Sequence, residues 1–286
     1  MVGPGRPLPT TAAALRQTAR VQGFPDPVGL TVADRLATIT LQRPESMNAL
    51  DRATKEQLLT AVRQAGDDAD VRAVLLIGTG RAFCVGQDLR EHVTALRELP
   101  LEQVWATVEE HFAPIASAVA TMPKPVVAAV NGVAAGAGAA LAFACDLRVL
   151  ADTASFHTAF AAIGLSCDTG ASWTLPRLVG HARAVDLLYR PRTVGAAEAE
   201  RLGLATVVVP ADRLHAEATA LARTLAGGPT LAYAGIRRSL AYAATHDLAD
   251  SLAFEATQMA ATGGSRDHRD AVAAFVAKQP PRFHGR

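Results

Sequence analysis

Cysteine is scarce in this 286-residue chain, and its distribution excludes two kinds of site. The three cysteines, Cys84, Cys145 and Cys167, are odd in number and lack Cys-x-x-Cys spacing, so we expect neither a disulfide framework nor a zinc site. Unpaired thiols favour a reducing compartment, and we therefore expect a cytoplasmic protein. The eight histidines include no His-x-x-x-His pair, and no metal site is predicted.

An excess of charge of either sign is also missing. The formal net charge is +1, and no basic run stands out, so nucleic acids and anionic membranes are not expected partners. The longest apolar stretch, Pro125–Cys145, is long enough to suggest a membrane span. Its Asn131 and its glycines favour a strand, a turn and a helix of a soluble protein instead.

The stretch from Lys124 to Leu150 is the most informative part of the sequence. Val126–Val130 is predicted to be a buried strand, and Asn131-Gly132 a turn. The helix that follows, to Ala144, is apolar all round, so it should be buried. The small residues at its start allow close approach by a ligand, and its first N–H groups have no partner within the helix. Such amides can hold a developing negative charge, although a plain core helix remains an alternative.

The order of the predicted elements indicates an α/β fold. Strands alternate with helices over residues 28–210, whereas residues 211–286 are helical throughout. Residues 1–27 are rich in Pro, Gly, Thr and Arg without an apolar signal segment, which predicts a flexible extension. We expect a polar, mobile segment at 90–100, and a helix over 101–121 that Pro114 kinks or resets.

Four ordered motifs resemble the crotonase superfamily of enoyl-CoA hydratases, isomerases and related acyl-CoA enzymes. The motifs are LQRPESMNAL (41–50), GRAFCVGQDL (80–89), KPVVAAVNGVAAGAGAALAFACDLRV (124–149) and LPRLVG (175–180). The resemblance covers residues 28–286 and implies a spiral of ββα units with a C-terminal helical layer. That layer drives trimer formation in the family, and trimers often pair into hexamers. The resemblance also implies an acyl-CoA thioester substrate, with no metal or redox cofactor beyond the coenzyme A of the substrate.

The resemblance also assigns site residues. It implies that the backbone N–H groups of Val85 and Ala137 hold the thioester oxygen as an oxyanion hole, in which each donor is typically worth about 3 kcal/mol of barrier. Ala137 stands where the family usually has glycine, but alanine still donates an N–H. The residues expected to line the coenzyme A and substrate site are Asn48, Ala49, Leu50, Gly86, Gln87, Asp88, Gly136, Phe160, Phe275 and Lys278. For Asp88 a helix cap is the alternative role, and for Lys278 a solvated surface position.

The chain departs from the hydratase pattern at both catalytic glutamates. These fall on Ala140 and Phe160, and neither side chain can exchange a proton. Asp168 lies nearby in sequence, as in the epoxyphenylacetyl-CoA isomerase branch, and in the 4-chlorobenzoyl-CoA dehalogenase branch, where the matching Asp is the nucleophile. Desolvation near Ile163 and Phe160 should raise the pKa of Asp168 toward that of a general base. The alternative is that Asp168 caps the helix beginning near Thr169 or Gly170.

These residues favour an isomerase that moves a double bond or rearranges a ring with Asp168 as its only base. The alternatives are a hydratase-like enzyme, an aryl-CoA enzyme with Asp168 as nucleophile, and a non-catalytic acyl-CoA binder. Cys167 is expected to be an inert thiol, His157 a hydrogen-bonded core histidine, and Trp173 part of the pocket wall or core.

Overall fold

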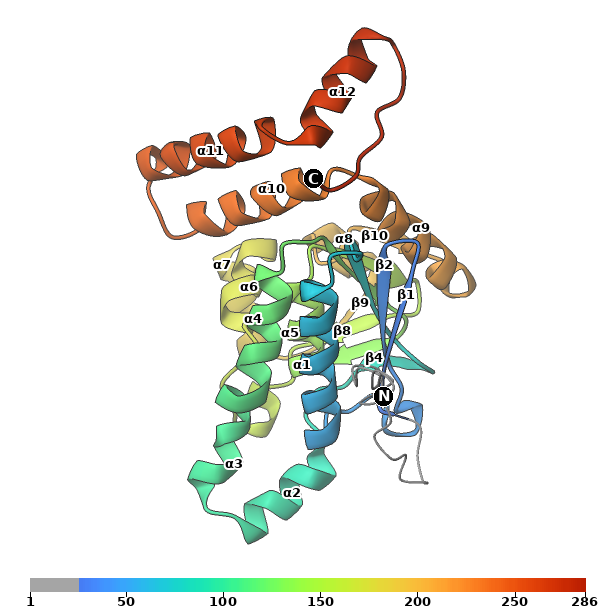
Figure 1. Ribbon diagram of the computed structural model, residues 1–286. Helices are drawn as coiled ribbons and strands as arrows, with labels where there is room; N and C mark the ends of the chain where they lie inside the picture. Colours follow the sequence, from blue (N-terminus) through green and yellow to red (C-terminus); the bar gives the residue numbers. More distant parts are fainter. Residues whose placement is uncertain (1–25) are drawn as a thin grey trace, which may run out of the picture.

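The chain folds around two β-sheets, seen in the computed structural model of Figure 1, which describes residues 26–286. The larger sheet has the strand order β1-β2-β3-β5-β7-β10. Its strands are β1 Val28–Ala33, β2 Leu36–Leu41, β3 Ala73–Gly78, β5 Val126–Val130, β7 Leu147–Ala151 and β10 Val207–Val209. β1 and β2 form an antiparallel hairpin, and the remaining pairs are parallel. The predicted extension, 1–27, lies almost wholly outside the described residues.

The smaller sheet explains how the chain becomes a spiral. Its order is β4-β6-β8-β9, with strands β4 Ala82–Cys84, β6 Val133–Ala135, β8 Ser155–His157 and β9 Thr193–Gly195. β4, β6 and β8 are parallel neighbours and follow β3, β5 and β7 along the chain. Each turn therefore adds one strand to each sheet, as expected for the ββα spiral that the motifs imply.

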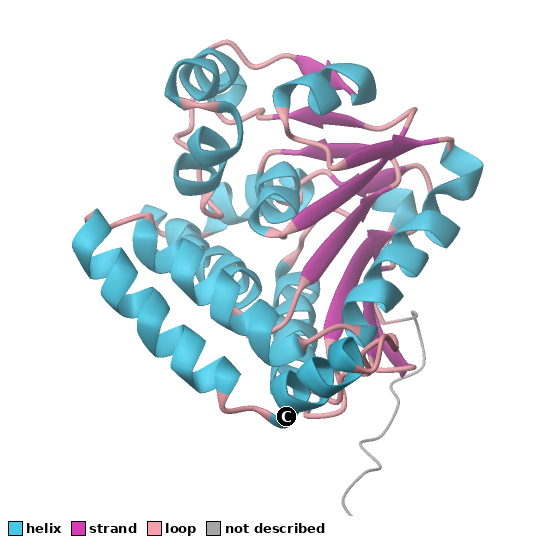
Figure 2. Cartoon of the chain, turned by 90° about the horizontal axis from the view of Figure 1, so that it is seen from above, coloured by secondary structure: helices cyan, strands magenta, loops and turns pink. Residues whose placement is uncertain are grey.

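Helices surround the sheets, as Figure 2 shows from above. They are α1 Arg52–Asp67, α2 Leu89–Glu98, α3 Leu101–Thr107, α4 Ala113–Thr121, α5 Ala137–Ala144, α6 Ala171–Val179, α7 His181–Tyr189, α8 Ala196–Leu202, α9 Leu214–Gly227, α10 Thr230–Ala243, α11 Leu248–Gly263 and α12 Arg266–Val276. α9 packs against β2, β3, β5 and β7. All eight residues of α5 are buried, which matches its apolar sequence. No helix in the described part of the chain has the length and hydropathy needed to cross a bilayer.

One expectation about local structure is wrong, and a second is confirmed. The segment predicted to be polar and mobile is helix α2, whose N-terminus is capped by Asp88 through hydrogen bonds from Arg90 N and Glu91 N. The predicted helix over 101–121 consists of α3, a π-helical turn Val108–Phe112 and α4. Pro114 lies in the first turn of α4, where a missing N–H is tolerated. The prediction that Pro114 resets the helix is therefore confirmed.

The last three helices extend away from the sheets, and the C-terminal end of the chain lies beside α10 (Figure 1). The guanidinium of Arg72, which is buried, donates to Thr230 Oγ1 at 2.7 Å and to Phe283 O at 2.9 Å. Asp267, at the start of α12, accepts hydrogen bonds from His284 N and Gly285 N. These bonds fix the position of α12 relative to α10.

Candidate functional site

Two segments that are far apart in sequence come into direct backbone contact at the centre of the molecule. Gly86 follows β4, and Gly138 lies in the first turn of α5. A Cβ atom on Gly86 would lie 2.9 Å from Ala135 O and 3.1 Å from Ala137 N. A Cβ on Gly138 would lie only 2.1 Å from Cys84 O. Glycine at these two positions is thus what allows the segments carrying Val85 and Ala137 to approach each other.

The two predicted donor amides are available for a ligand. Over residues 26–286, neither Val85 N nor Ala137 N donates a hydrogen bond to another part of the chain. Ala137 is the first residue of α5 and is 3 % exposed. Gly136, with φ 50° and ψ −124°, turns the chain into the helix, so Ala137 itself needs no left-handed backbone. Alanine is therefore compatible with the donor role at this position.

The predicted coenzyme A residues 48–50 and 86–88 form a ledge beside these amides. Leu50 N donates to Gly86 O, and Asp88 N donates to Leu50 O, so the two strips run side by side. Asn48 is fully buried and donates through Nδ2 to Thr79 O and Ala82 O. We call the segments 48–50 and 86–88 the ledge.

Arg43 forms ion pairs that connect the ledge to the start of α1. Its Nη2 lies 3.1 Å from Asp51 Oδ2 and 3.1 Å from Asp88 Oδ2. Asp51 caps α1, and Asp88 caps α2, so one guanidinium links two helix starts. Burial alone would raise the pKa of Asp88, but hydrogen bonds from Glu91 N, Arg43 and Arg90 N hold it below its usual range. Asp88 has the cap role that was the alternative to direct participation.

Asp168 lies in the loop before α6 and is half-buried. Burial raises the pKa of this carboxyl, opposed by a hydrogen bond from Thr169 Oγ1 at 2.8 Å and by the charge of Lys55. The N-cap of α6 is Gly170, and no side chain caps that helix. The alternative that Asp168 serves as a helix cap is therefore wrong.

The loop of Asp168 packs against the start of α5. Ala140, Phe160 and Ala171 form a small buried apolar cluster, with Cys167 against it. The Phe160 ring lies 4.0 Å from where a Cβ on Gly136 would be. The two positions that the motif resemblance assigns to the glutamates thus belong to one buried apolar cluster. Asp168 is the raised-pKa carboxyl next to that cluster.

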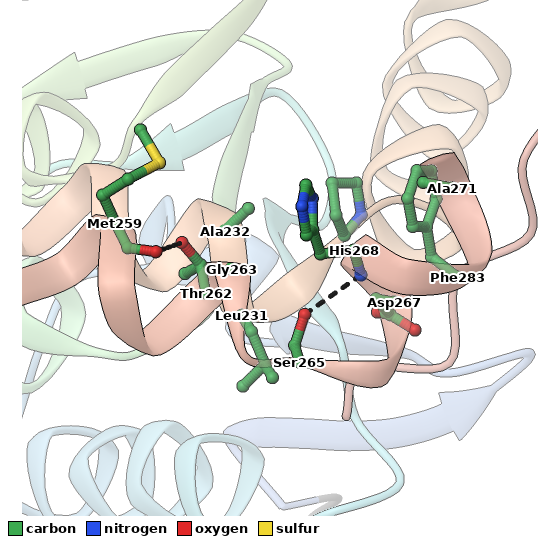
Figure 3. A pocket seen from close by; sticks show the side chains of 11 residues that line it. Leu231, Ala232, Met259, Thr262, Gly263, Ser265, Asp267, His268, Ala271 and Phe283 are labelled. Carbon is green, nitrogen blue, oxygen red and sulfur yellow. Dashed lines mark hydrogen bonds between the residues drawn. The ribbon is translucent and has the colours of Figure 1, made fainter. Parts of the chain in front are cut away.

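Two predicted site residues are not brought to the ledge within one chain. Phe275, on α12, is 83 % exposed, and Lys278 follows that helix on the surface. In Figure 1, α12 lies at the opposite end of the molecule from α2 and α3. A cavity of about 340 Å³ lies between α10, α11, α12 and the C-terminal residues (Figure 3), and Leu231, Met259 and Phe283 line it.

The structure changes the interpretation of two further side chains. His157 is half-buried, and its ring makes no hydrogen bond within residues 26–286, so its expected role as a hydrogen-bonded core histidine is wrong. Trp173 is 42 % exposed and stacks under the Arg177 guanidinium, 4.0 Å from the ring centroid. It is therefore not a core residue.

Lys55 is the residue near the site that sequence reasoning missed. It is 2 % exposed, and its Nζ donates to Gln87 Oε1 of the ledge at 3.1 Å. A signal was available, because Lys55 lies three residues before Leu58 and seven before Val62, on the apolar face of α1. A lysine in that position indicates a buried partner.

Comparison with known proteins agrees with the motifs. The model of the enoyl-CoA hydratase/isomerase family matches residues 31–286. A protein of Rhodobacter capsulatus named "Probable enoyl-CoA hydratase" is 43 % identical over 255 residues, covering 89 % of this chain and 96 % of its own. The 1,2-epoxyphenylacetyl-CoA isomerase of Escherichia coli is 39 % identical over 249 residues, covering 87 % and 95 %.

A solved structure is also similar over nearly the whole chain. The crystal structure of a candidate enoyl-CoA hydratase/isomerase from Mycobacterium abscessus superimposes with a TM-score of 0.87 at 43 % identity. It covers 91 % of this chain and 100 % of its own. The fold and the sequence comparisons therefore agree with each other.

Proposed function

This chain belongs to the enoyl-CoA hydratase/isomerase family of acyl-CoA enzymes, and we propose that it is an isomerase that uses Asp168 as its single general base. The observation that carries the proposal is the buried apolar cluster of Ala140, Phe160 and Ala171, with Cys167 packed against it, next to the half-buried Asp168 carboxyl, whose pKa burial raises. Neither Ala140 nor Phe160 can move a proton, whereas a carboxyl with raised pKa is suited to that task. The similarity to the isomerase of Escherichia coli supports the same choice.

The mechanism follows from the free amides and the carboxyl. The thioester oxygen accepts hydrogen bonds from Val85 N–H and Ala137 N–H, which stabilise negative charge on that oxygen. Asp168 removes a proton from a substrate carbon, and the electron pair of the broken C–H bond delocalises onto the thioester oxygen as an enolate. Protonated Asp168 then returns the proton to a different carbon, and the thioester carbonyl re-forms. Base and substrate both regain their starting charge, so no metal or redox cofactor is needed.

The exposed apolar residues of the C-terminal helices support a trimer, or a hexamer of two trimers, as part of the same proposal. Leu252 and Met259 on α11, and Phe275 and Val276 on α12, are all more than half exposed in the single chain. Exposed apolar residues on neighbouring helices are typical of a protein interface. Association there also offers a route for Phe275 and Lys278 to reach the ledge of another copy. Because all three cysteines are free thiols, a cytoplasmic location fits best.

The test is a mass-spectrometric screen of enoyl- and aryl-CoA thioesters in deuterated water. We expect deuterium to appear at substrate carbon without the mass gain of one water. Asp168→Asn should lower that exchange by at least about 10²-fold while retaining thioester binding measured by calorimetry. Asp270→Asn is the matched control, because Asp270 is a solvent-exposed carboxylate on α12 that pairs with Arg266.

Three other results would contradict the proposal. The mass gain of one water by the wild-type protein would show a hydratase, the activity named for the Rhodobacter capsulatus relative. An ester trapped on Asp168 would show a nucleophile. Thioester binding without turnover on any member of the panel would show an acyl-CoA binder.

A further inference from the structure

Lys55 presents an ammonium group that is almost completely withdrawn from solvent. It lies in α1 and is 2 % exposed. Its Nζ donates to Thr107 Oγ1 at 2.7 Å and to Gln87 Oε1 at 3.1 Å, and Glu91 Oε1 lies 3.6 Å away. A lysine is rarely buried in this way unless its charge is paired. Three side-chain oxygen atoms, from Thr107, Gln87 and Glu91, thus surround the buried ammonium.

The partners of Lys55 connect it to the segment that carries the first oxyanion donor. Gln87 follows Gly86 on the ledge, two residues after Val85. Its Nε2 also lies 3.3 Å from Glu91 Oε1 on α2. Thr107 is the last residue of α3. One ammonium thus links α1, the ledge and the end of α3 at a single point.

A second set of contacts places Lys55 and the loop of Asp168 against the same face of a third segment, the π-helical turn and α4. The Lys55 Nζ lies 5.2 Å from the centroid of the Phe112 ring. Gly170, two residues after Asp168, packs against Ala116, with 4.0 Å between the Ala116 Cβ and a Cβ placed on Gly170. Phe112 and Ala116 are four residues apart in continuous helical structure, so they lie on one face about one turn apart. Lys55 and the Asp168 loop therefore pack on adjacent turns.

We propose that Lys55 is a positioning residue of the candidate active site, which holds Gln87 against the oxyanion segment and places a buried positive charge near the loop of Asp168. This inference rests on the proposed function, because it assigns Asp168 as the base. Lys55 acts through Gln87 and through its charge, without touching the reacting atoms. The ionised form of Asp168 is the form that accepts a proton, and a nearby cation favours it.

Other charged groups also surround Lys55. Burial lowers the pKa of Lys55, whereas Glu91 and Asp51 raise it and Arg52 lowers it. A cavity of about 220 Å³ adjoins the ammonium between α1, α2 and α3. The titratable or charged groups that face it there are Arg52, Glu91, His92, Glu110 and His111. For Asp168 itself, Lys55 is the one cation among the causes of its altered pKa.

The test compares Lys55→Met with Lys55→Arg by measuring the pH dependence of deuterium exchange into the substrate. Methionine keeps a similar length without the charge, so the pKa of Asp168 should rise further. The acidic limb of kcat/KM should then move up by about 0.5 to 1 pH unit. Lys55→Arg should keep the limb at the wild-type position. Thr107→Val is the matched control, because it removes the 2.7 Å acceptor and retains the charge, so the limb should not move.

A second measurement separates this inference from the proposed function. Carbodiimide labelling of Asp168, quantified by peptide mass spectrometry against pH, reads the protonation of the carboxyl without turnover. We expect its midpoint to rise in Lys55→Met by the same amount as the kinetic limb. If the wild type exchanges no substrate hydrogen but the midpoint still moves, the proposed function fails and the role of Lys55 stands. A midpoint unchanged in folded Lys55→Met, or in Lys55→Gln should the first variant not fold, would refute it.

Discussion

Substitution of Gly138 by alanine tests whether the two oxyanion segments depend on direct backbone contact. A Cβ at this position would lie 2.1 Å from Cys84 O and 2.6 Å from Cys84 C. Real Cβ contacts are essentially never below 3.0 Å. The start of α5 and the end of β4 must therefore move apart by about 0.9 Å, which is close to the displacement of about 1 Å that can impair catalysis. The atoms in the way belong to the backbone, which cannot rotate aside as a side chain can.

Two opposing terms determine how much Gly138→Ala changes the free energy of unfolding. Overpacking of this kind costs about 1–3 kcal/mol, while alanine gains up to about 1 kcal/mol over glycine inside a helix. The difference is a net loss of about 0–2 kcal/mol, which corresponds to a fall in Tm of up to about 8 °C for a chain of this size. The effect on catalysis should be larger, because misplacing a reacting group by about 1 Å can reduce a rate about 10²-fold.

Thermal unfolding measures the effect of Gly138→Ala on stability, and deuterium exchange into the substrate measures its effect on catalysis. Gly227→Ala is the matched control, since Gly227 is the last residue of α9 and a Cβ there would meet nothing within 4 Å. We expect the control to keep wild-type exchange and to have an unchanged or slightly higher Tm. Gly138→Ala with a wild-type Tm and exchange within about twofold of wild type would show that the contact is unimportant, against the expected 10²-fold loss.

Three further predictions concern single charged residues. Burial raises the folded-state pKa of Asp168, so its ionisation opposes folding once the pH exceeds the unfolded-state pKa. Asp168→Asn should therefore have a higher Tm than wild type at pH 7, and scans from pH 7 to pH 3 should show the difference disappearing at the acidic end. Arg72→Leu should lower the free energy of unfolding by about 3 kcal/mol, because buried carbonyl oxygens lose their donor; urea titration measures this loss, and limited proteolysis should cut first near the C-terminus. Arg237 pairs with Asp146 at 2.9 Å and donates to carbonyls at the end of α4. Arg237→Met should lower the free energy of unfolding by about 2–3 kcal/mol, which the same urea titration measures.

Most long elements of the fold could be predicted from the sequence, whereas the short strands β4, β6 and β9 could not. Val126–Val130 and α5 appear where their apolar runs predict them. β4, β6 and β9 have three residues each, too few to show an alternating pattern. Their pairing is determined by neighbouring turns of the spiral, which no local pattern reveals.

Helix α2 was missed for a different reason. Its apolar residues Leu89, Val93 and Leu96 recur at helical spacing, but charged residues outnumber them, and none of its residues is buried in the single chain. A start signal was nevertheless present, because Asp88 is followed three residues later by Glu91. In the structure Asp88 is the cap, whereas Glu91 Oε2 accepts from Arg52 N on α1.

The candidate site shows the same division between local and tertiary information. The motifs identify the segments of Val85 and Ala137 and the loop of Asp168. The position of Lys55 on the apolar face of α1 signals a buried lysine but does not identify its partners, because Gln87 and Thr107 are 32 and 52 residues away. Only the tertiary fold brings these acceptors around the ammonium, and only there does the lysine become a site residue.

Backbone atoms form one half of the candidate site, and side chains form the other. The donors at 85 and 137 depend on close approach at Gly86 and Gly138, so they tolerate alanine for glycine at 137 as long as the helix begins at that residue. Proton transfer depends instead on which side chain faces the substrate. A glutamate at position 140 alone would meet Phe160 and Ala171 instead of a second carboxylate, and its burial would favour the neutral form. The fold can therefore keep its proposed oxyanion segments while the position of the base changes, and the base proposed for this chain, Asp168, lies in the loop before α6.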